Sequence, residues 1–455
     1  MANTLTNYDG SITTSPQQLV YPETVAEIQA VLKDTARYPS PVRAMGSHHS
    51  LTPCAVSDGT IVNMSRMTRI VKIDEARHTI TAEAGLQYIE ASNALRQKNL
   101  QFLLNIEIGN LTLGSAACCH TKDGLDGREF GQVSSYVTAI KWVNPAGELE
   151  EASEDTNPEL LRRMRSSYGL CGIIYEVTLR VKPLEVAEFT YLPRPVDQLT
   201  DSEVASIIDR GEGLVCWTVA RTACFQTKRR VDDAGLLARL QADTRRHLWN
   251  HTVAFLARSI EKFLDRPFET LAQDEAFRLT RMLFFTLEMT GGLRILNPDK
   301  TIDYRHTEAS ARYAFTFWAF PRDQWLSTLR AYLDFADDHQ RRYGFRCNMP
   351  LGSYFVRKDN SSLLSYTAAG DTFSIDPIHA PTDQAAWDRF LREFNEFAAK
   401  RDGIPLLNQS PFITREQCEQ AYGARWTEFS AWVRSTDSSG RMLNPFFREL
   451  LLQPQ

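Results

Sequence analysis

The sequence has little of what marks a membrane, secreted or nucleic-acid-binding protein. No apolar run approaches the roughly 18 residues that a membrane-spanning helix needs. The N-terminal residues carry neither the basic start nor the apolar stretch of a signal peptide, so we expect a cytoplasmic protein. Positive charge is not in excess either. The net charge of −5 gives no reason to expect nucleic acid or an anionic membrane surface as a partner.

Cysteines at paired spacing are also lacking. The eight cysteines are scattered along 455 residues, without the spacing of a zinc site. A chain of this length does not need disulfides to fold, so we expect reduced thiols and no metal. Cys118 and Cys119 are the one adjacent pair, and we interpret them as packing residues. The remaining composition, 43% hydrophobic and 24% charged, is typical of a globular chain with room for two or three domains.

The most distinctive short stretch runs from Arg43 to Ser50 and contains Gly46 and two consecutive histidines, His48 and His49. Two histidines suit a core poorly, because each buried imidazole needs a hydrogen-bond partner. Glycine lets the backbone approach a ligand closely, and successive backbone amides in such a turn can form an anion site for a diphosphate. The stretch predicts a ligand-binding loop, and a plain surface turn is the alternative.

Local patterns along the chain predict short strands with covering helices. Thr24 and Glu27 have capping-box spacing at the start of a helix over 22–32. Strands are expected at 60–64, 70–74, 79–85, 137–143 and 175–181, and a helix near 87–98. The small residues at 114–119 predict a loop that lies flat against a planar partner or packs tightly. Together these patterns indicate an α+β fold.

Several segments, taken in order, resemble one family. They are the 22–32 helix, Gly46-Ser47-His48-His49-Ser50, Met67-Thr68-Arg69-Ile70, Leu111-Thr112-Leu113-Gly114-Ser115 and Gly169-Leu170-Cys171-Gly172-Ile173-Ile174, with Gly440-Arg441-Met442-Leu443-Asn444-Pro445-Phe446-Phe447 near the end. The chain resembles FAD-dependent oxidoreductases of the vanillyl-alcohol oxidase superfamily, in the branch of aldonolactone and alditol oxidases. The resemblance is dense over residues 7–183 and thin beyond them.

The resemblance implies an α+β architecture with three parts. Residues 1–185 would form a PCMH-type FAD-binding domain of two α+β subdomains. Residues 186–420 would form a substrate domain with an antiparallel sheet covered by helices, and residues 421–455 would return to the FAD domain. Apolar residues recur at helical spacing near 235–290, which predicts a helical insertion. Core packing, a lid and a dimer surface are the alternatives for that insertion.

The resemblance also implies where FAD binds. Loop 43–50 would wrap the pyrophosphate, segment 110–124 would pass along the flavin, and Ile173 and Ile174 would meet the adenine. His49 lies where many family members attach the flavin covalently, and His48 is the competing nucleophile. The implied cofactor contacts are Arg43, Met45, Gly46, Ser47, His48, His49, Ser50, Asn110, Gly114, Ser115, Cys118, His120, Ile173 and Ile174.

On the substrate side the sequence departs from the family. Strand alternation over Tyr313–Pro321 puts Phe315 and Phe317 on one face, where relatives carry acidic residues. The family's Glu-x-Arg pair aligns with Gly352-Ser353-Tyr354-Phe355-Val356, where both charged residues are missing and Tyr354 remains. Its His-Trp-Gly-Lys motif aligns with Leu406-Leu407-Asn408-Gln409, so the lysine is absent too. We therefore expect a pocket formed by Phe315, Phe317, Tyr354 and Gln409. The alternative is that the aromatics only pack in the core, since a one-residue slip reverses the strand face.

These expectations predict an FAD-dependent oxidoreductase that transfers a hydride from a small-molecule CH–OH donor to flavin N5. The donor would have an apolar or aromatic body, and oxygen or another acceptor would reoxidise the flavin. Tyr354, Gln409 and His120 are the candidate catalytic residues. A sugar, polyol or aldonolactone is the alternative donor. A flavin-binding protein without redox activity is a second alternative, which the missing charges favour and His49 opposes.

Overall fold

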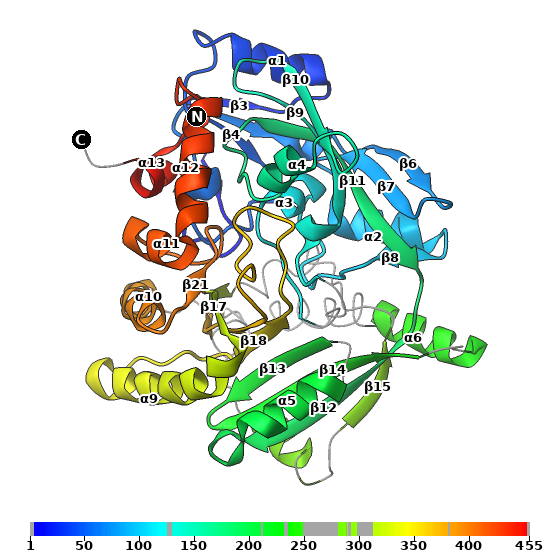
Figure 1. Cartoon of the computed structure of the whole chain (residues 1–455), viewed down its shortest axis with the longest axis vertical. Coiled ribbons are helices and arrows are strands. Elements are labelled where there is room, and N and C mark those ends of the chain that lie inside the picture. The colour runs from blue at the N-terminus through cyan, green and yellow to red at the C-terminus, as the bar shows by residue number, and fades with distance from the viewer. Residues whose placement is uncertain are drawn as a thin grey trace, which may run out of the picture.

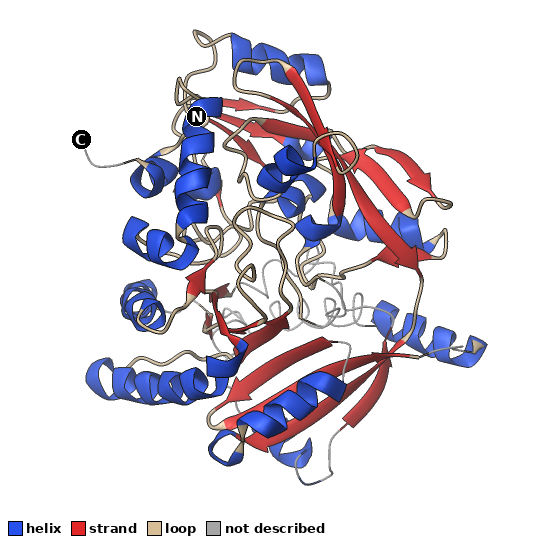
Figure 2. Ribbon diagram, viewed as in Figure 1, coloured by secondary structure: helices blue, strands red, loops and turns tan. Residues whose placement is uncertain are grey.

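The computed structural model describes residues 4–124, 130–210, 213–231, 235–248, 281–287, 289, 293–297, 313–380 and 383–452. The N-terminal half, from blue to cyan, lies above the green and yellow sheet of the second half (Figure 1). The helices of the last part of the chain, in red, lie beside the N-terminal half. Strands and helices are mixed in both halves (Figure 2), so the predicted α+β class is confirmed.

The N-terminal half contains a small sheet that pairs β1 (Leu5–Thr6) with β2 (Thr13–Thr14), and two larger sheets. A parallel three-stranded sheet has the order β3 (Gln18–Val20), β5 (Thr60–Asn63), β4 (Val42–Met45). Helix α1 (Val25–Lys33) follows β3; Thr24 caps it, and Glu27 completes the expected capping box. Its apolar face, formed by Ile28, Val31 and Leu32, is buried. The end of β4 carries the chain directly into the loop with the two histidines.

The second larger sheet is antiparallel and has the order β10-β9-β11-β7-β6, with β8 paired to β11. Its strands are β6 (Ile70–Asp74), β7 (Thr79–Glu83), β8 (Leu100–Phe102), β9 (Val137–Val143), β10 (Leu149–Ser153) and β11 (Ile173–Pro183). The accompanying helices are α2 (Tyr88–Arg96), α3 (Leu113–Cys118) and α4 (Pro158–Met164). The small residues expected in a loop therefore form a short helix, α3, which contacts β7 and β11.

The second half is built on an eight-stranded sheet of order β15-β12-β14-β13-β18-β19-β17-β21. Its strands are β12 (Ala187–Pro195), β13 (Gly213–Val219), β14 (Thr222–Arg230), β15 (Leu293–Asn297), β17 (Trp318–Pro321), β18 (Leu351–Val356), β19 (Thr372–Ile375) and β21 (Ile404–Pro405). Helix α5 (Asp201–Arg210) contacts β14, and α9 (Trp325–Tyr343) contacts β17 and β19. This is the expected antiparallel sheet with helical cover.

The strand expected over 313–321 is interrupted. Its first part, β16 (Ala314–Phe315), pairs with β20 (Ile378–His379), whereas β17 pairs with β19 and β21. Between them the backbone amide of Thr316 donates to the Pro377 carbonyl, and that of Phe317 donates to the Gln409 carbonyl. Because the chain changes partners here, simple alternation does not hold across the segment.

Four further helices belong to the later part of the chain: α10 (Gln384–Ala399), α11 (Arg415–Tyr422), α12 (Ala424–Thr436) and α13 (Pro445–Leu451). The guanidinium of Arg441 donates to the carbonyls of Val31 and Leu32 at the end of α1. The carboxamide of Asn444 donates to the carbonyls of Pro53 and Val56. The C-terminal segment therefore contacts the N-terminal half close to the histidine loop.

The predicted insertion at 235–290 is described only in part. Helix α6 (Leu236–Leu248) and a helical segment at 281–287 are present, and the remainder lies outside the described residues. Among the described helices, none combines the length and apolarity needed to cross a bilayer. All eight cysteines, each in the described part, are free.

Candidate active site

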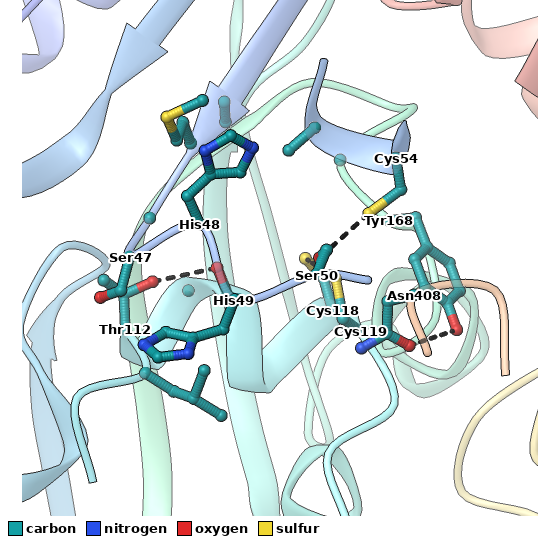
Figure 3. Close-up of a pocket in the computed structure, with 18 of the residues that line it drawn as sticks. Ser47, His48, His49, Ser50, Cys54, Thr112, Cys118, Cys119, Tyr168 and Asn408 are labelled. Carbon is teal, nitrogen blue, oxygen red and sulfur yellow. Dashed lines mark hydrogen bonds between the residues drawn. The ribbon is translucent and has the colours of Figure 1, made fainter. Parts of the chain in front are cut away.

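Two adjoining cavities lie between the halves of the molecule. The first is lined by the loop after β4, by residues of α3 and by Asn408 and Gln409 from the second half (Figure 3). The second is lined by residues from both halves, including Lys122, Trp217, Tyr354 and Asp376. Residues shared by both linings are Ile108, Leu111, Thr121, Phe315 and Gln409. A ligand in one cavity would thus contact the same wall as a ligand in the other.

The histidine loop passes very close to α3. A Cβ atom on Gly46 would lie 2.2 Å from Thr112 Oγ1 and 2.8 Å from Ser115 Oγ, so only glycine fits without displacing them. His48 has a left-handed backbone, with φ of 56°. The backbone amides of Ser47, His48 and His49 make no hydrogen bond within the described part of the chain. Unpaired amides next to a left-handed residue are typical of an anion-binding turn.

The two imidazoles point to different sides of this loop (Figure 3). The ring of His49 stacks at a tilt on Tyr8, with 4.7 Å between ring centroids. Its Nδ1 is buried and has no hydrogen-bond partner among the described residues. Burial, with a smaller contribution from His48, lowers the pKa of His49 to about 4, so the ring is neutral at physiological pH. His49 therefore presents a neutral nitrogen with an available lone pair.

Arg43 lies at the first cavity, but its guanidinium is fully used by the protein. Nε and Nη2 donate to the Cys54 carbonyl, Nη2 also to the Tyr168 carbonyl, and Nη1 to the carbonyls of Gly169 and Met442. These bonds account for all five N–H groups of an arginine. The Arg43 side chain therefore joins three segments behind the loop, and any contact of this residue with a cofactor would involve groups other than its guanidinium N–H donors.

The other expected cofactor residues divide into two groups. Met45, Gly46, Ser47, His48, His49, Ser50, Gly114, Ser115, Cys118 and Ile174 line the first cavity. Asn110, His120 and Ile173 do not. Ile173 and Ile174 are neighbours on β11, so their side chains point to opposite faces, and Ile173 enters the hydrophobic core. Asn110 is buried beside the loop, where its carbonyl accepts a hydrogen bond from Ser47 Oγ.

His120 lies behind the site rather than in it. It is fully buried, with Nδ1 at 2.6 Å from the hydroxyl of Tyr168, and it lines neither cavity. Its backbone carbonyl accepts hydrogen bonds from the carboxamides of Asn408, at 3.2 Å, and Gln409, at 3.1 Å. Burial lowers the pKa of His120 to about 3. This histidine connects the two halves, and the structure gives it no direct access to a substrate.

The expected substrate residues are only partly brought together. Phe315, Tyr354 and Gln409 line the second cavity, whereas Phe317 does not. Phe317 is fully buried with Ala319, Val356, Tyr366 and Leu406 in a separate apolar cluster. The expectation that Phe315 and Phe317 share the pocket face is wrong, because the strand is interrupted between them.

Four charged residues that the sequence pattern did not single out line the second cavity, and they are Glu107, Lys122, Asp123 and Asp376. Lys122 follows α3 by a few residues, and Asp376 immediately follows β19. The Lys122 ammonium lies 3.4 Å from Asp376 Oδ2, and both side chains are buried. The expected loss of charge on the substrate side is therefore only local. The strands on which the resemblance implies charged residues lack them here, but other segments supply an acidic and a basic side chain that form an ion pair.

The described residues contain no cluster of three or more His, Cys, Asp or Glu side chains that could hold a metal ion.

Comparisons with known proteins agree with this arrangement. Residues 16–153 match the FAD binding domain family, and residues 177–450 match the D-arabinono-1,4-lactone oxidase family. The chain is 21% identical to L-gulonolactone oxidase of Scyliorhinus torazame, covering 97% of each chain. It is 23% identical to L-gulono-1,4-lactone dehydrogenase of Mycobacterium tuberculosis, covering 98% of each chain. Cholesterol oxidase from B. sterolicum has the same fold, with a TM-score of 0.75 at 14% identity over 99% of this chain and 97% of that one.

The second family match covers more than half of the sequence, and the first contains the histidine loop and α3. The expected relationship to the aldonolactone oxidase branch of the vanillyl-alcohol oxidase superfamily is confirmed. The chain belongs to the D-arabinono-1,4-lactone oxidase family and is an FAD-dependent oxidoreductase that acts on CH–OH donors.

Proposed function

We propose that the chain carries FAD covalently on His49 and oxidises a small CH–OH donor with a polar hydroxyl end and an apolar or aromatic body. The observation that carries the substrate part is the mixed lining of the second cavity. Trp217, Tyr313, Phe315 and Ile378 supply apolar surface, and the buried Lys122–Asp376 pair supplies the polar end. Burial of apolar donor surface would contribute about 25 cal/mol per Å².

The residues of the first cavity fit FAD. The loop 46–50 offers unpaired backbone amides for a diphosphate, and Gly46 leaves no room for a side chain between the loop and α3. Gly114 and Ser115 also line this cavity, and their small size leaves space in it for a ligand. When bound, FAD supplies the acceptor for the hydride.

The covalent attachment is supported by the state of His49. Its buried Nδ1 has no partner in the described part of the chain, and the lowered pKa keeps the ring neutral. A neutral imidazole nitrogen is the form that acts as a nucleophile. Tyr8 restricts the ring by stacking on it. His48 is the less suitable partner because its ring points to the other side of the loop (Figure 3).

An aldonolactone is the second candidate donor. The relatives named above are a lactone oxidase and a lactone dehydrogenase and match the chain over nearly its whole length. Glu107 and Asp123 also line the second cavity and could accept hydrogen bonds from additional hydroxyls. The two relatives differ in the acceptor implied by their names, so oxygen or another electron acceptor is proposed to reoxidise the flavin.

Anaerobic flavin reduction tests this proposal. The oxidised protein is mixed with benzyl alcohol, cyclohexanol, xylitol or L-gulono-1,4-lactone, and the flavin absorbance is followed. We expect the apolar alcohols to reduce the flavin faster than the polyol and the lactone. Faster reduction by the lactone or xylitol would select the second candidate. Flavin that stays oxidised with every donor would support a non-redox role instead.

A further inference from the structure

Asp376 is held rigidly at the edge of the substrate cavity. Its backbone amide donates to the Gly352 carbonyl at 2.8 Å, and the Gly352 amide donates to the Asp376 carbonyl at 3.1 Å. The residue is 2% exposed and lines the second cavity. Its backbone is thus fixed by β18, and its carboxylate has little freedom to move toward solvent.

The carboxylate of Asp376 is only half satisfied. Oδ2 lies 3.4 Å from the Lys122 ammonium, whereas Oδ1 is buried and has no hydrogen-bond partner within the described residues. A buried carboxylate normally has several donors, because leaving an acceptor unpaired is costly. Asp359 has 2% exposure too, but accepts hydrogen bonds from Gln132, Ser135 and the Ser361 amide. Among the described residues, Asp376 thus retains a free acceptor, Oδ1, at the lining of the second cavity.

Lys122 is held beside Asp376 by two aromatic rings. Its ammonium lies 4.2 Å from the ring centroid of Phe317 and 4.1 Å from that of Tyr354. Phe317 therefore influences the cavity from behind by positioning the lysine. Thr121, which precedes Lys122 in the chain, lines both cavities. Lys122 and Asp376 line only the second cavity, so they lie on the substrate side of the wall that the two cavities share.

We propose that Asp376 is the general base of the reaction and accepts the hydroxyl proton of the donor, while Lys122 positions its carboxylate. This inference rests on the proposed function. The O–H bond of the donor breaks, and its electron pair forms the carbonyl of the product. The C–H bond breaks at the same carbon, and its two electrons leave with the hydride to oxidised FAD. The donor is oxidised, FAD is reduced, and the proton passes from Asp376 to solvent.

The electrostatics of the cavity suit this role. Burial raises the pKa of Asp376 to about 7, against the opposing effects of the Lys122 charge and of the nearby Ser374 side chain. Besides Asp376 and Lys122, the titratable groups in the cavity lining are Glu107, Asp123, Tyr313 and Tyr354. A base with a pKa near the working pH combines a large deprotonated fraction with enough basicity to take a proton. Neither Tyr354 nor His120 matches this, because burial raises the pKa of Tyr354 well above its usual value and His120 lies outside the cavity.

The first test compares Asp376→Asn with the buried control Asp359→Asn. In anaerobic stopped-flow mixing, with the fastest donor of the panel, we expect Asp376→Asn to lower the limiting rate of flavin reduction by about 10²–10⁴-fold. The dissociation constant of the donor should change much less. The wild-type rate should fall as pH decreases below about 7, because the base becomes protonated, and Asp376→Asn should lose this inflection. Asp359→Asn should retain both rate and inflection.

Lys122 is tested as a positioning residue by its effect on that inflection. Lys122→Met should move the inflection to higher pH, because the carboxylate loses its counter-ion, and Lys122→Arg should move it back toward the wild-type value. Asp376→Asn removes the carboxylate partner of a buried ammonium and could unfold the protein. The double variant Asp376→Asn/Lys122→Met removes both charges and provides a folded comparison that also lacks the inflection.

A readout that does not depend on turnover separates this inference from the proposed function. Infrared spectra of the FAD-loaded protein should show a carboxylic acid C=O band that titrates near neutral pH in wild type and Asp359→Asn, and that is absent in Asp376→Asn. If no donor reduces the wild-type flavin, the proposed function fails and this band still decides whether Asp376 exchanges a proton. An unchanged reduction rate in Asp376→Asn, or no titrating band, would overturn the assignment of Asp376.

Discussion

The cofactor side and the substrate side of the site are built in different ways. The cofactor side uses continuous stretches of chain, the loop after β4 and helix α3, whose glycines and small side chains line the first cavity. The substrate side collects single side chains from distant segments, such as Lys122, Trp217, Phe315 and Asp376. A continuous motif carries its geometry with it, whereas a set of separate side chains acquires its geometry only from the fold.

Because the substrate side is assembled from separate side chains, its charged groups can come from segments other than the expected ones. Gly352–Val356 on β18 and the Phe315 segment lack the acidic and basic groups that the family would place there. The Lys122–Asp376 pair comes instead from the chain after α3 and from the turn after β19. Side chains from different positions in the sequence can place a charge at the same location in a cavity.

The largest expected effect concerns the cofactor side. His49→Ala should abolish covalent flavin completely, because it removes the nucleophile that the loop presents. Acid-precipitated wild-type protein should remain yellow and fluoresce on a denaturing gel, and His49→Ala should lose this signal. His48→Ala is the matched control and should keep it. Complete release of flavin from precipitated wild type would show that the attachment does not exist.

The variant Arg43→Lys tests whether the buried hydrogen bonds of the Arg43 guanidinium stabilise the region behind the histidine loop. Lysine cannot replace the forked guanidinium, so several buried carbonyls lose their donors. We expect the free energy of unfolding in urea to fall by about 3–5 kcal/mol. Arg66→Lys, in an exposed ion pair with Glu23, should change it by less than about 1 kcal/mol. Equal effects of the two variants would contradict the structural role of Arg43.

Phe315 and Phe317 provide a test within the substrate side. Phe317→Ala should lower the free energy of unfolding by about 3–5 kcal/mol, because the side chain is fully buried. Phe315→Ala should affect stability less and should weaken binding of an apolar donor by about tenfold, since Phe315 lines both cavities. Urea titration and donor-dependent flavin reduction measure the two effects. If Phe317→Ala instead weakened donor binding and Phe315→Ala lowered stability more, Phe317 rather than Phe315 would line the pocket.

The smallest expected effect is a difference in pH dependence. The pKa of His120 is lowered from 6.5 to about 3, so stability is lost as pH falls below 6.5, where only the unfolded state binds the proton. Between pH 7.5 and 6.0 this loss is about 0.8 kcal/mol. The pKa of Asp376 is raised from 3.8 to about 7, so stability is lost as pH rises toward 7, by about 1 kcal/mol between pH 6.0 and 7.5.

Urea titrations at these two pH values check both signs. Relative to wild type, His120→Gln should reduce the loss of stability on acidification, and Asp376→Asn should reduce the loss on raising the pH. The His120 and Asp376 variants should therefore change the pH slope in opposite directions. Slopes that change in the same direction would show that burial does not shift one of the two pKa values as described.

The sequence by itself determined the α+β class, the capping box of α1 and the family, because each depends on residues that are close together in the chain. The histidine loop could be recognised for the same reason. The sequence could not reveal that Arg43 donates all its N–H groups to carbonyls far away in the chain, or that residues 113–118 form a helix.

Only the tertiary structure decided which side chains meet at the substrate. The change of strand partners after Phe315 buries Phe317, and the pairing of Asp376 with Gly352 brings its carboxylate to Lys122. These contacts join residues that are far apart in the chain. Their geometry depends on strand register and on an interrupted strand, and local propensity encodes neither.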